Sequence, residues 1–508
     1  MDVYLEAMLA ASQHLFTKGP MLGVLIVLPV SLVSGLLPGG GLPVAVVILG
    51  FATYLDPWIA ITSVVFAMAI SDASEPVPCI LLGVPGTRSS QATVLDGYPM
   101  AQKGLAGVAL GASYTSNLVG GIIGAMALLL SLPIAREIVL WLSAAEFFLL
   151  SLLGVLAVAV VSAGAFVKGM LTGALGLGIA MIGFCPISGD IRATLGTEYL
   201  WDGFAFAPIV VGLFAVPEAI GLVMSGTPIA RERMAAMLKE SRADVYRGMR
   251  AAFRHFWLLI YSSLIGVFVG MIPGAGGSAA HWLAYMVARQ TEKGARKTFG
   301  TGDVRGVIAP EAANNSVDGG VLVPTVAFGI PGSSGMALVL AILILGGITP
   351  GPKMLTEHLD MTISLVYTIV LANVIGVPIM LMFAPVITRV AAILPDVLGP
   401  IVIGIVTLTA YMATQSLTDL VVVLGFAALG IFMKASGWPR PPILIALVLG
   451  KTLEKYLWIA INAFGLRMLL RPQFLAIIVL IFLVIAIGIY TQRASERGRR
   501  QATNGAPR

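Results

Sequence analysis

Residues 72–86 read DASEPVPCILLGVPG, and residues 318–332 read DGGVLVPTVAFGIPG. With a constant offset of 246, apolar residues fall on apolar residues. Identical residues include Asp72 and Asp318, Pro78 and Pro324, Gly83 and Gly329, Pro85 and Pro331, and Gly86 and Gly332. A glycine-rich break precedes each stretch, PGGG at 38–41 and PGAGG at 273–277, with an offset of 235. Such self-similarity predicts two structurally related halves.

The composition around this repeat is that of a membrane protein. The 508 residues are 58% hydrophobic and 11% charged, whereas soluble domains are about 25% charged. The apolar stretches that reach or approach the about 20 residues of a membrane-crossing helix are 21–37, 107–132, 146–167, 256–272, 363–386 and 472–490. Counting the segments that Gly and Pro interrupt, we predict an all-α polytopic protein with about 10–12 transmembrane helices in the lipid bilayer.

Basic residues indicate the orientation, because cytoplasmic loops collect Lys and Arg. Seven of them lie between Arg231 and Arg254, and five follow Gln492 in the C-terminal tail. We expect both segments to be cytoplasmic. The predicted division is a first transmembrane repeat (1–230), a basic cytoplasmic linker (231–254), a second transmembrane repeat (255–470), and a final helix with a basic tail (471–508). Topology explains the net charge of +6, so we expect no nucleic-acid partner.

The interrupted apolar segments are the predicted binding region. Paired Gly/Pro breaks at matching places in two halves are typical of a transporter site near the middle of the membrane. At such a break, exposed N–H groups favour an anion and freed carbonyls hold a cation. Glycine also lets a ligand approach the main chain. The alternative is that these residues only make kinks and close helix contacts.

Seven motifs extend the pattern along most of the chain. They are GLLPGGG (35–41), LLGVPGTRSSQAT (81–93), LDGYPMAQKG (95–104), GMIPGAGG (270–277), PEAANNSVDGGVLVP (310–324), FGIPGSSGMA (328–337) and GITPGPKML (347–355). Together they resemble the large membrane subunit of the tripartite tricarboxylate transporters (TctA type), from about Gly35 to Gly450.

This resemblance implies a cation-coupled importer of carboxylates in the bacterial inner (cytoplasmic) membrane, with a tricarboxylate, a dicarboxylate or an aromatic acid as substrate. It implies two partner chains, a small membrane subunit (TctB type) and a periplasmic solute-binding protein (TctC type). It also implies two related, inverted halves with re-entrant hairpins near 72–90 and 314–336, and an elevator-like movement. We expect no cofactor. The coupling ion is expected to be Na⁺ or H⁺, and we expect no metal other than sodium.

We expect the substrate to meet the glycine-rich breaks and the hairpin tips through hydroxyl and backbone N–H groups. The predicted substrate-binding residues are Gly39, Gly40, Pro85, Gly86, Thr87, Arg88, Ser89, Ser90, Gly274, Gly276, Pro331, Gly332, Ser333 and Ser334. Arg88 either pairs with a substrate carboxylate or is a topological or snorkelling residue.

The coupling ion is expected among oxygen-bearing side chains near the breaks, since sodium is a hard cation. The predicted residues are Asp72, Glu75, Asn314, Asn315, Ser316, Asp318 and Thr325. Glu75 lies in SDASEP (71–76), where many members of the family have a Gly-Gly-Ser type sequence. The substrate or the coupling ion of this chain could therefore differ from theirs. Because a charge at membrane depth is costly, each acidic residue is either a proton carrier or structurally paired. The asparagines either bind an ion or tie down a broken helix.

Two other functional classes are alternatives. A channel shares the polar breaks, but a repeated site at mid-membrane suits alternating access better. An intramembrane enzyme needs a catalytic set such as HExxH, which the sequence lacks, although the symmetric pair Asp72 and Asp318 leaves a carboxylate mechanism open. Gly450-Lys451-Thr452 resembles the end of a phosphate-binding loop, but Ile445 replaces a required glycine. We therefore expect a carrier and no enzymatic activity.

Overall fold

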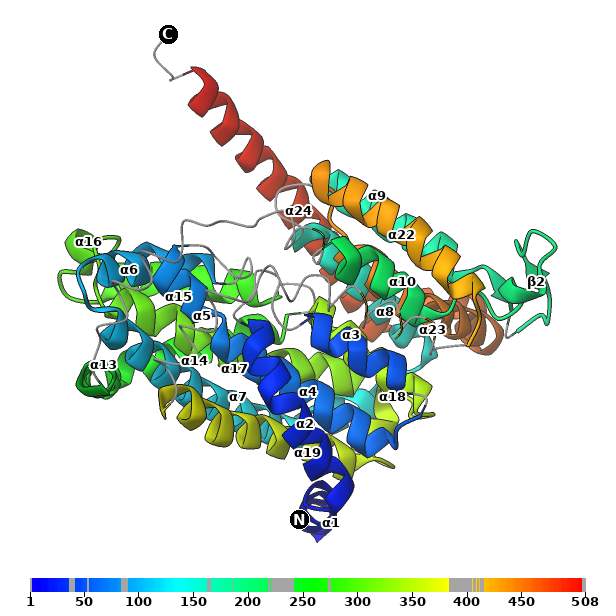
Figure 1. The fold of residues 1–508 in the computed structure, drawn as a ribbon. Coiled ribbons are helices and arrows are strands. Elements are labelled where there is room, and N and C mark those ends of the chain that lie inside the picture. Colours follow the sequence, from blue (N-terminus) through cyan, green and yellow to red (C-terminus); the bar gives the residue numbers. More distant parts are fainter. Residues whose placement is uncertain are drawn as a thin grey trace.

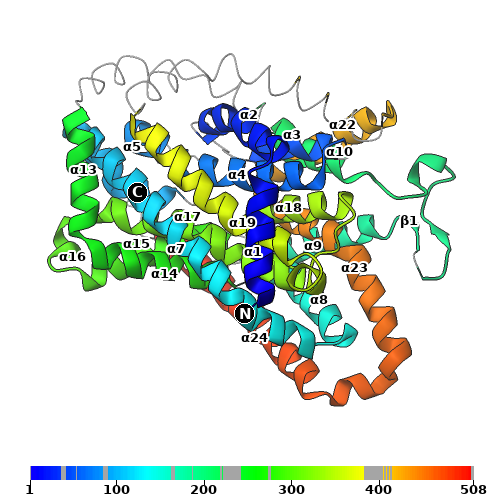
Figure 2. The same cartoon turned by 90° about the horizontal axis from the view of Figure 1, so that it is seen from below.

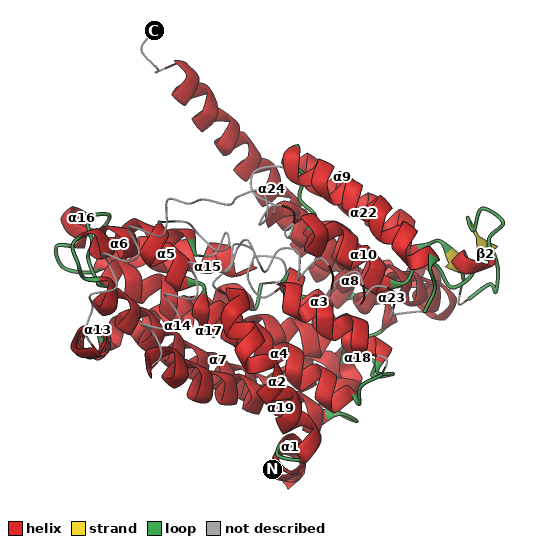
Figure 3. Ribbon diagram, in the orientation of Figure 1, coloured by secondary structure: helices red, strands yellow, loops and turns green. Residues whose placement is uncertain are grey.

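The computed structural model describes residues 2–35, 42–52, 54–83, 90–161, 166–185, 187–217, 242–272, 276–382 and 415–504, together with residues 220, 404, 408 and 411. These residues are nearly all helical (Figure 3), which confirms the all-α prediction. Two short strands, β1 (Gly183–Phe184) and β2 (Ile191–Arg192), pair antiparallel in a hairpin at one edge of the molecule.

The helices follow one another in chain order (Figure 1). In the first half they are α1 (Asp2–Leu15), α2 (Lys18–Gly35), α3 (Leu42–Phe51), α4 (Pro57–Ser74), α5 (Pro76–Leu82), α6 (Gln91–Gln102), α7 (Ala106–Trp141), α8 (Ala144–Val161), α9 (Phe166–Ala180), η1 (Glu198–Leu200), α10 (Phe206–Val210) and η2 (Val211–Ala215). After it come α13 (Arg242–Arg254), α14 (Phe256–Gly270), α15 (Gly276–Thr291), α16 (Ala295–Thr298), α17 (Arg305–Phe328), α18 (Ser334–Leu345), η3 (Pro352–Leu355), α19 (Leu359–Leu371), η4 (Ala372–Gly376), α22 (Thr418–Ala435), α23 (Pro441–Phe464), η5 (Gly465–Leu470) and α24 (Pro472–Asn504).

Six helical segments of the described chain are long and apolar enough to cross a membrane, which confirms a polytopic membrane protein. They are Lys18–Gly35, Pro57–Leu81, Ala106–Trp141, Leu359–Met382, Thr418–Ala435 and Pro472–Tyr490. The pair α13 and α14, bent by 77°, makes a seventh if it counts as one span. The sequence-based number is larger because it included interrupted segments. The described chain also contains four apolar helices that are shorter than a full span: Ala144–Val158, Phe166–Ala180, Phe206–Ala215 and Ser334–Leu345.

The internal repeat is visible in the backbone. The joined helices α4 and α5 correspond to α17, and both end at the glycine that the offset of 246 predicts. Gly83 has φ 67° and ψ 18°, and Gly329 has φ 67° and ψ 24°. This left-handed conformation favours glycine, which has no Cβ to clash. The two breaks therefore begin with the same turn.

Helix contacts repeat as well. A Cβ added to Gly35 would collide with the backbone carbonyl of Ser71 and the side chain of Ser74. A Cβ added to Gly270 would lie 2.9 Å from the carbonyl oxygen of Val317 and 3.1 Å from Cα of Gly320. These contact positions are 317 and 320, which are again 71 and 74 shifted by 246. The contact of α2 with α4 is therefore equivalent to that of α14 with α17.

Helix α17 forms the centre of one side of the molecule, among α7, α14 and α15 (Figure 2). Every residue from Gly306 to Ala327 is buried. Glycines allow α7 to approach it closely: a Cβ on Gly120 would overlap the carbonyl of Ala312, and one on Gly124 would lie 2.7 Å from the carbonyl oxygen of Ser316. Small residues four apart are the usual device for close helix packing in membranes.

A second part of the repeat was missed in the sequence. Residues 116–120 read SNLVG and residues 372–376 read ANVIG, with an offset of 256. The first segment lies on α7 and contacts α17, whereas the second forms η4 and contacts α4. Each half therefore supplies a helix that packs against the central helix of the other half.

The predicted linker 231–254 is partly a structured helix. Residues 231–241 lie outside the described residues, but α13 begins at Arg242 and packs along α7. A Cβ on Gly111 would overlap the carbonyl of Val245, and a Cβ on Gly248 would overlap that of Val108. The basic residues of α13 therefore stand on a helix that is docked against the first half. At the other end of the chain, α24 extends away from the body (Figure 1).

Candidate substrate and cation site

Polar side chains in the middle of α17 define the candidate site. Asn315 and Ser316 have no exposed surface, and Asn314 and Asp318 are each 8% exposed. Polar groups buried this deeply are costly unless they find partners. The positions of their partners show which of these residues stabilise the helix packing and which have capacity left for a ligand.

The symmetric acids Asp72 and Asp318 meet. Their side chains lie within hydrogen-bonding reach of each other, although they are 246 positions apart in the sequence. Asn314 joins the contact, because its Nδ2 donates to the backbone carbonyl oxygen of Asp72 at 2.9 Å. Two residues at equivalent positions of the two repeats are therefore neighbours in the structure, and both carry a carboxyl group.

The carboxyl pair has unused capacity. Oδ2 of Asp318 is buried without a hydrogen-bond partner among the described residues. Glu75, 3% exposed at the junction of α4 and α5, is close enough to act electrostatically on Asp318. No lysine or arginine of the described chain forms an ion pair with Asp72 or Asp318. Neighbouring carboxyl groups in a low dielectric do not both stay charged without a proton or a cation between them.

A histidine closes the other side of this group. Nε2 of His281, on α15, lies 2.8 Å from Oδ1 of Asn314, and the histidine is 2% exposed. Asn314 therefore bridges His281 to Asp72. Asp72 itself is only partly buried. The group Asp72, Asp318, Asn314 and His281 is here named the carboxyl cluster.

Asn315, Ser316 and Thr325, also predicted as ion ligands, make hydrogen bonds within the protein. Asn315 Nδ2 donates to Oδ1 of Asn373 at 2.7 Å, which ties α17 to η4. The hydroxyl of Ser316 donates to the carbonyl of Ala313 at 3.1 Å, and that of Thr325 donates to the carbonyl of Val321 at 2.6 Å. These contacts satisfy the two hydroxyls inside α17. Within the described chain, Oδ1 of Asn315 is the one oxygen of these three side chains that is buried without a partner.

The second break lies between α17 and α18. After Gly329 the chain passes through Pro331 and Gly332, both buried, and α18 begins at Ser334. Ser333 caps α18, because its Oγ accepts a hydrogen bond from the backbone N–H of Met336 at 3.3 Å. The N–H groups of a helix N-terminus attract anions. Ser333 and Ser334 are partly exposed there.

Other predicted residues have less structural description. Ser90 is 4% exposed directly before α6, and Gly276 is the first residue of α15. The rest lie outside the described residues: Gly39, Gly40, Pro85, Gly86, Thr87, Arg88, Ser89 and Gly274. Their role in substrate binding stays a prediction.

A buried glutamate near the start of α17 was not among the predicted residues. Glu311 is 1% exposed and accepts hydrogen bonds from Oγ1 of Thr93 at 2.5 Å and from Nδ2 of Asn117 at 2.9 Å. It therefore links α6, α7 and α17. The motifs LLGVPGTRSSQAT and PEAANNSVDGGVLVP contain two of these residues, but no local pattern pairs them.

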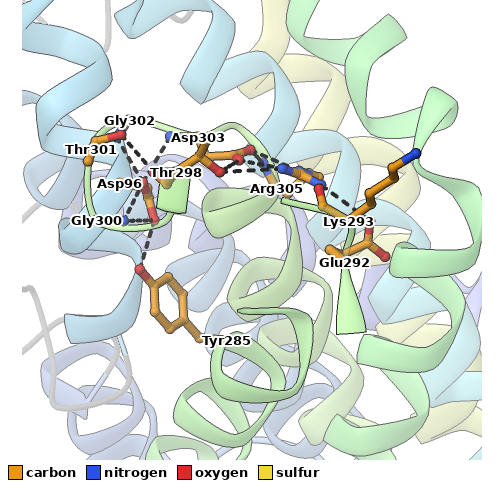
Figure 4. A network of polar contacts seen from close by, with 10 residues as sticks. All are labelled: Asp96, Tyr285, Glu292, Lys293, Thr298, Gly300, Thr301, Gly302, Asp303 and Arg305. Carbon is orange, nitrogen blue, oxygen red and sulfur yellow. Dashed lines mark hydrogen bonds and ion pairs between the residues drawn. The ribbon is translucent and has the colours of Figure 1, made fainter. Parts of the chain in front are cut away.

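A second missed residue, Asp96, connects the two halves (Figure 4). It lies on α6, has no exposed surface, and accepts hydrogen bonds from the backbone N–H groups of Gly300, Gly302 and Asp303 at 2.8–3.0 Å. The hydroxyl of Tyr285 donates to its Oδ2 at 2.8 Å. One carboxylate thus holds the loop that leads into α17.

The same loop carries an ion pair. Arg305 binds Asp303, with Nη2 2.7 Å from Oδ2, and its Nη1 also donates to the carbonyl of Lys293 at 3.0 Å (Figure 4). Burial opposes ionisation of Asp303, but hydrogen bonds from Arg305 and Thr298 outweigh it and hold the pKa of Asp303 below its usual value. Asp96 on α6 and Asp303 in the loop therefore both anchor this loop.

We expect Asp96→Asn to lower the free energy of unfolding by about 2–4 kcal/mol, because an amide replaces a charged acceptor of several hydrogen bonds. Thermal and denaturant unfolding of the purified protein in detergent measures the change. Glu137→Gln, an exposed acid on α7, is the matched control and should leave stability within about 0.5 kcal/mol of the original protein. Equal stability of the Asp96 variant would contradict the anchoring role.

Comparisons with known proteins agree with the motifs. A family model described as "Tripartite tricarboxylate transporter TctA family" matches residues 21–445. Over 444 residues, 86% of this chain and 85% of the relative, the chain is 27% identical to an Agrobacterium vitis protein described as an uncharacterized 52.8 kDa protein in the TAR-I ttuC' 3' region. Over 192 residues, 38% of this chain and 79% of the relative, it is 28% identical to another from that organism, in the TAR-II ttuC' 3' region. No solved structure matches.

Proposed function

Because this chain belongs to the TctA family of tripartite tricarboxylate transporters, we propose that it is the permease subunit of a binding-protein-dependent secondary transporter. It imports carboxylates of the tricarboxylate or dicarboxylate class, and a sodium or proton gradient supplies the energy. The family is one component of a three-part system. The proposed partners are a small membrane subunit of the TctB type and a periplasmic solute-binding protein of the TctC type, in the bacterial inner membrane.

The carboxyl cluster is the observation that supports this function most. Two acids from matching positions of the repeats share one buried site, and one oxygen of Asp318 has no partner among the described residues. A proton or a sodium ion between Asp72 and Asp318 neutralises the pair, and its release restores the charge. A site that needs one bound cation to be neutral suits cation-coupled transport.

The substrate carboxylate belongs at the second break in this proposal. The N-terminus of α18 presents N–H groups there, with the partly exposed Ser333 and Ser334 beside them. The break follows the same helix that carries Asp318, so α17 links the two proposed sites. By symmetry, the hairpin tip of the first half, with Thr87, Arg88 and Ser89, supplies the other side of the substrate site.

We extend the proposal to an elevator-like movement of the helices that hold both breaks. Two contacts between the halves support it: Asp96 on α6 holds the loop before α17, and Glu311 on α17 binds Thr93 on α6. Such links favour movement of α6 and α17 as one body. The linker 231–254 and the C-terminus are on the cytoplasmic side in this proposal.

Uptake into proteoliposomes tests the function. The vesicles contain this chain, its small subunit and its binding protein, and accumulation of radiolabelled citrate and smaller carboxylates is followed with a sodium gradient, a proton gradient or neither. We expect accumulation with one of the gradients, and a reduction of at least about tenfold in Asn314→Ala and in Ser333→Ala, since each loses a polar contact at its site. Ser12→Ala, at a partly exposed serine on α1, is the control. If neither the sodium gradient nor the proton gradient drove accumulation, the proposal would be refuted.

A further inference from the structure

A cavity of about 390 Å³ lies away from the carboxyl cluster. Its walls come from the end of α17, from α18, from the loop 347–350, from α23 and from the segment 202–206. Most lining residues are apolar, among them Ile182, Phe206, Phe328, Leu340 and Ile348. This size is within the range of sites for small organic molecules.

Two lysines line the cavity from α23. Lys451 and Lys455 are four residues apart, so they share one face of the helix. Nζ of Lys451 donates to the backbone carbonyl of Asp202 at 3.1 Å, and Lys455 is exposed. Within the described chain Lys455 forms no ion pair.

The nearest acid along α23 does not neutralise these lysines. Glu454 is bound by the guanidinium of Arg192 through two hydrogen bonds, of 2.7 and 2.9 Å. Among the described residues, Asp202 is the only carboxylate in the cavity lining, against the two ammonium groups of Lys451 and Lys455. Like charges four residues apart on a helix repel each other. The wall thus carries an excess of one positive charge, which an anion would compensate.

Hydroxyl groups stand at the same place. Thr452 follows Lys451 on α23, and Thr349 belongs to the loop 347–350, which also lines the cavity. The cavity therefore combines ammonium and hydroxyl donors with an apolar surface. These donors suit an acid group, and the apolar surface suits a hydrocarbon body.

We propose that this cavity binds an organic anion, with its acid group between Lys451 and Lys455 and its body against the apolar wall. Two sources share this chemistry, a soluble carboxylate and the headgroup region of an anionic lipid. The ligand lies beside Gly329, where α17 ends, four residues before Ser333. The cavity is thus distinct from the carboxyl cluster and adjacent to the second break, and its occupancy does not depend on transport.

Acetylation of individual lysines in the purified full-length protein tests the site locally. N-hydroxysuccinimidyl acetate modifies exposed amines, and peptide mass spectrometry measures the rate at Lys455. The probes are citrate, benzoate, and nanodiscs of phosphatidylcholine with or without phosphatidylglycerol. Lys297, an exposed lysine of α16 that does not line the cavity, is the internal control for changes of ionic strength.

We expect at least one probe to slow acetylation of Lys455 at least about fivefold while Lys297 reacts at an unchanged rate. Lys451→Gln should raise the concentration of that probe for half-protection about tenfold, because one of two charge-assisted contacts is lost. Lys451→Arg should keep the affinity. Protection by citrate or benzoate identifies a soluble acid, and protection by phosphatidylglycerol alone identifies a lipid.

The proposal is overturned if none of the probes protects Lys455, or if Lys451→Gln leaves the protection unchanged. Should Lys451→Gln fail to fold, Thr452→Val in the same wall, with its hydroxyl removed, replaces it with the same expectation. Asp318→Asn should leave the protection intact. Failure of transport and failure of this site are therefore seen in separate measurements.

Discussion

Asp318→Asn is expected to abolish gradient-driven accumulation of the carboxylate substrate. The amide keeps the size of the side chain but cannot hold a proton or bind a cation as a carboxylate does, so the pair with Asp72 loses its exchangeable charge. We expect at least about a 100-fold reduction of driven uptake, equivalent to about 2.7 kcal/mol. The measurement is initial uptake into proteoliposomes with an imposed sodium or proton gradient.

Exchange without a gradient distinguishes coupling from general damage. The Asp318 variant should still exchange external for internal substrate, because the second break is unchanged. Asp360→Asn, an acid at the start of α19 whose Oδ1 accepts from the N–H of Met361, is the matched control and should retain driven uptake. Full gradient dependence in Asp318→Asn would show that the carboxyl cluster does not couple transport to the cation.

Gly319→Ala is expected to cause the largest loss of stability among single-methyl additions in the core. A Cβ at position 319 would overlap the backbone carbonyl of Gly124 on α7. Since the obstacle is backbone and not a flexible side chain, α7 and α17 must separate. We expect the free energy of unfolding to fall by about 3 kcal/mol or more, measured by denaturant unfolding in detergent.

The chain offers a control with the same chemistry. Gly178, in α9, has nothing within 4 Å of an added Cβ. Gly178→Ala should be neutral or stabilise by up to about 1 kcal/mol, because alanine is the better helix former. If Gly319→Ala were as stable as Gly178→Ala, the close contact of α7 with α17 would not be a feature of the folded protein.

Local sequence features predicted several elements correctly. The apolar stretches 21–37 and 107–132 correspond to α2 and α7. The offset of 246 matched Gly83 with Gly329, and these two glycines share one backbone conformation. Apolar length and glycine punctuation are properties of a few consecutive residues, so they can be read without knowledge of the fold.

The sequence matched Asp72 with Asp318 but did not predict the contacts around them. Asp72 and Asp318 were matched by symmetry, yet symmetry alone does not say whether equivalent residues touch. Asn314 was predicted as an ion ligand, and the structure adds its bridge between Asp72 and His281. Residues 84–89, at the first hairpin tip, lie outside the described residues.

By itself, then, the sequence determined that this protein is an all-α polytopic membrane protein and that Gly83 and Gly329 are matching positions. Tertiary structure alone decided which residues meet: Asp72 with Asp318, Lys451 with the backbone carbonyl of Asp202, and Asp96 with Gly300, which is 204 positions away. The physical reason is that helix formation and membrane insertion depend on neighbours along the chain. A buried carboxylate instead takes its partners from whatever backbone the packing of distant helices brings within hydrogen-bonding distance.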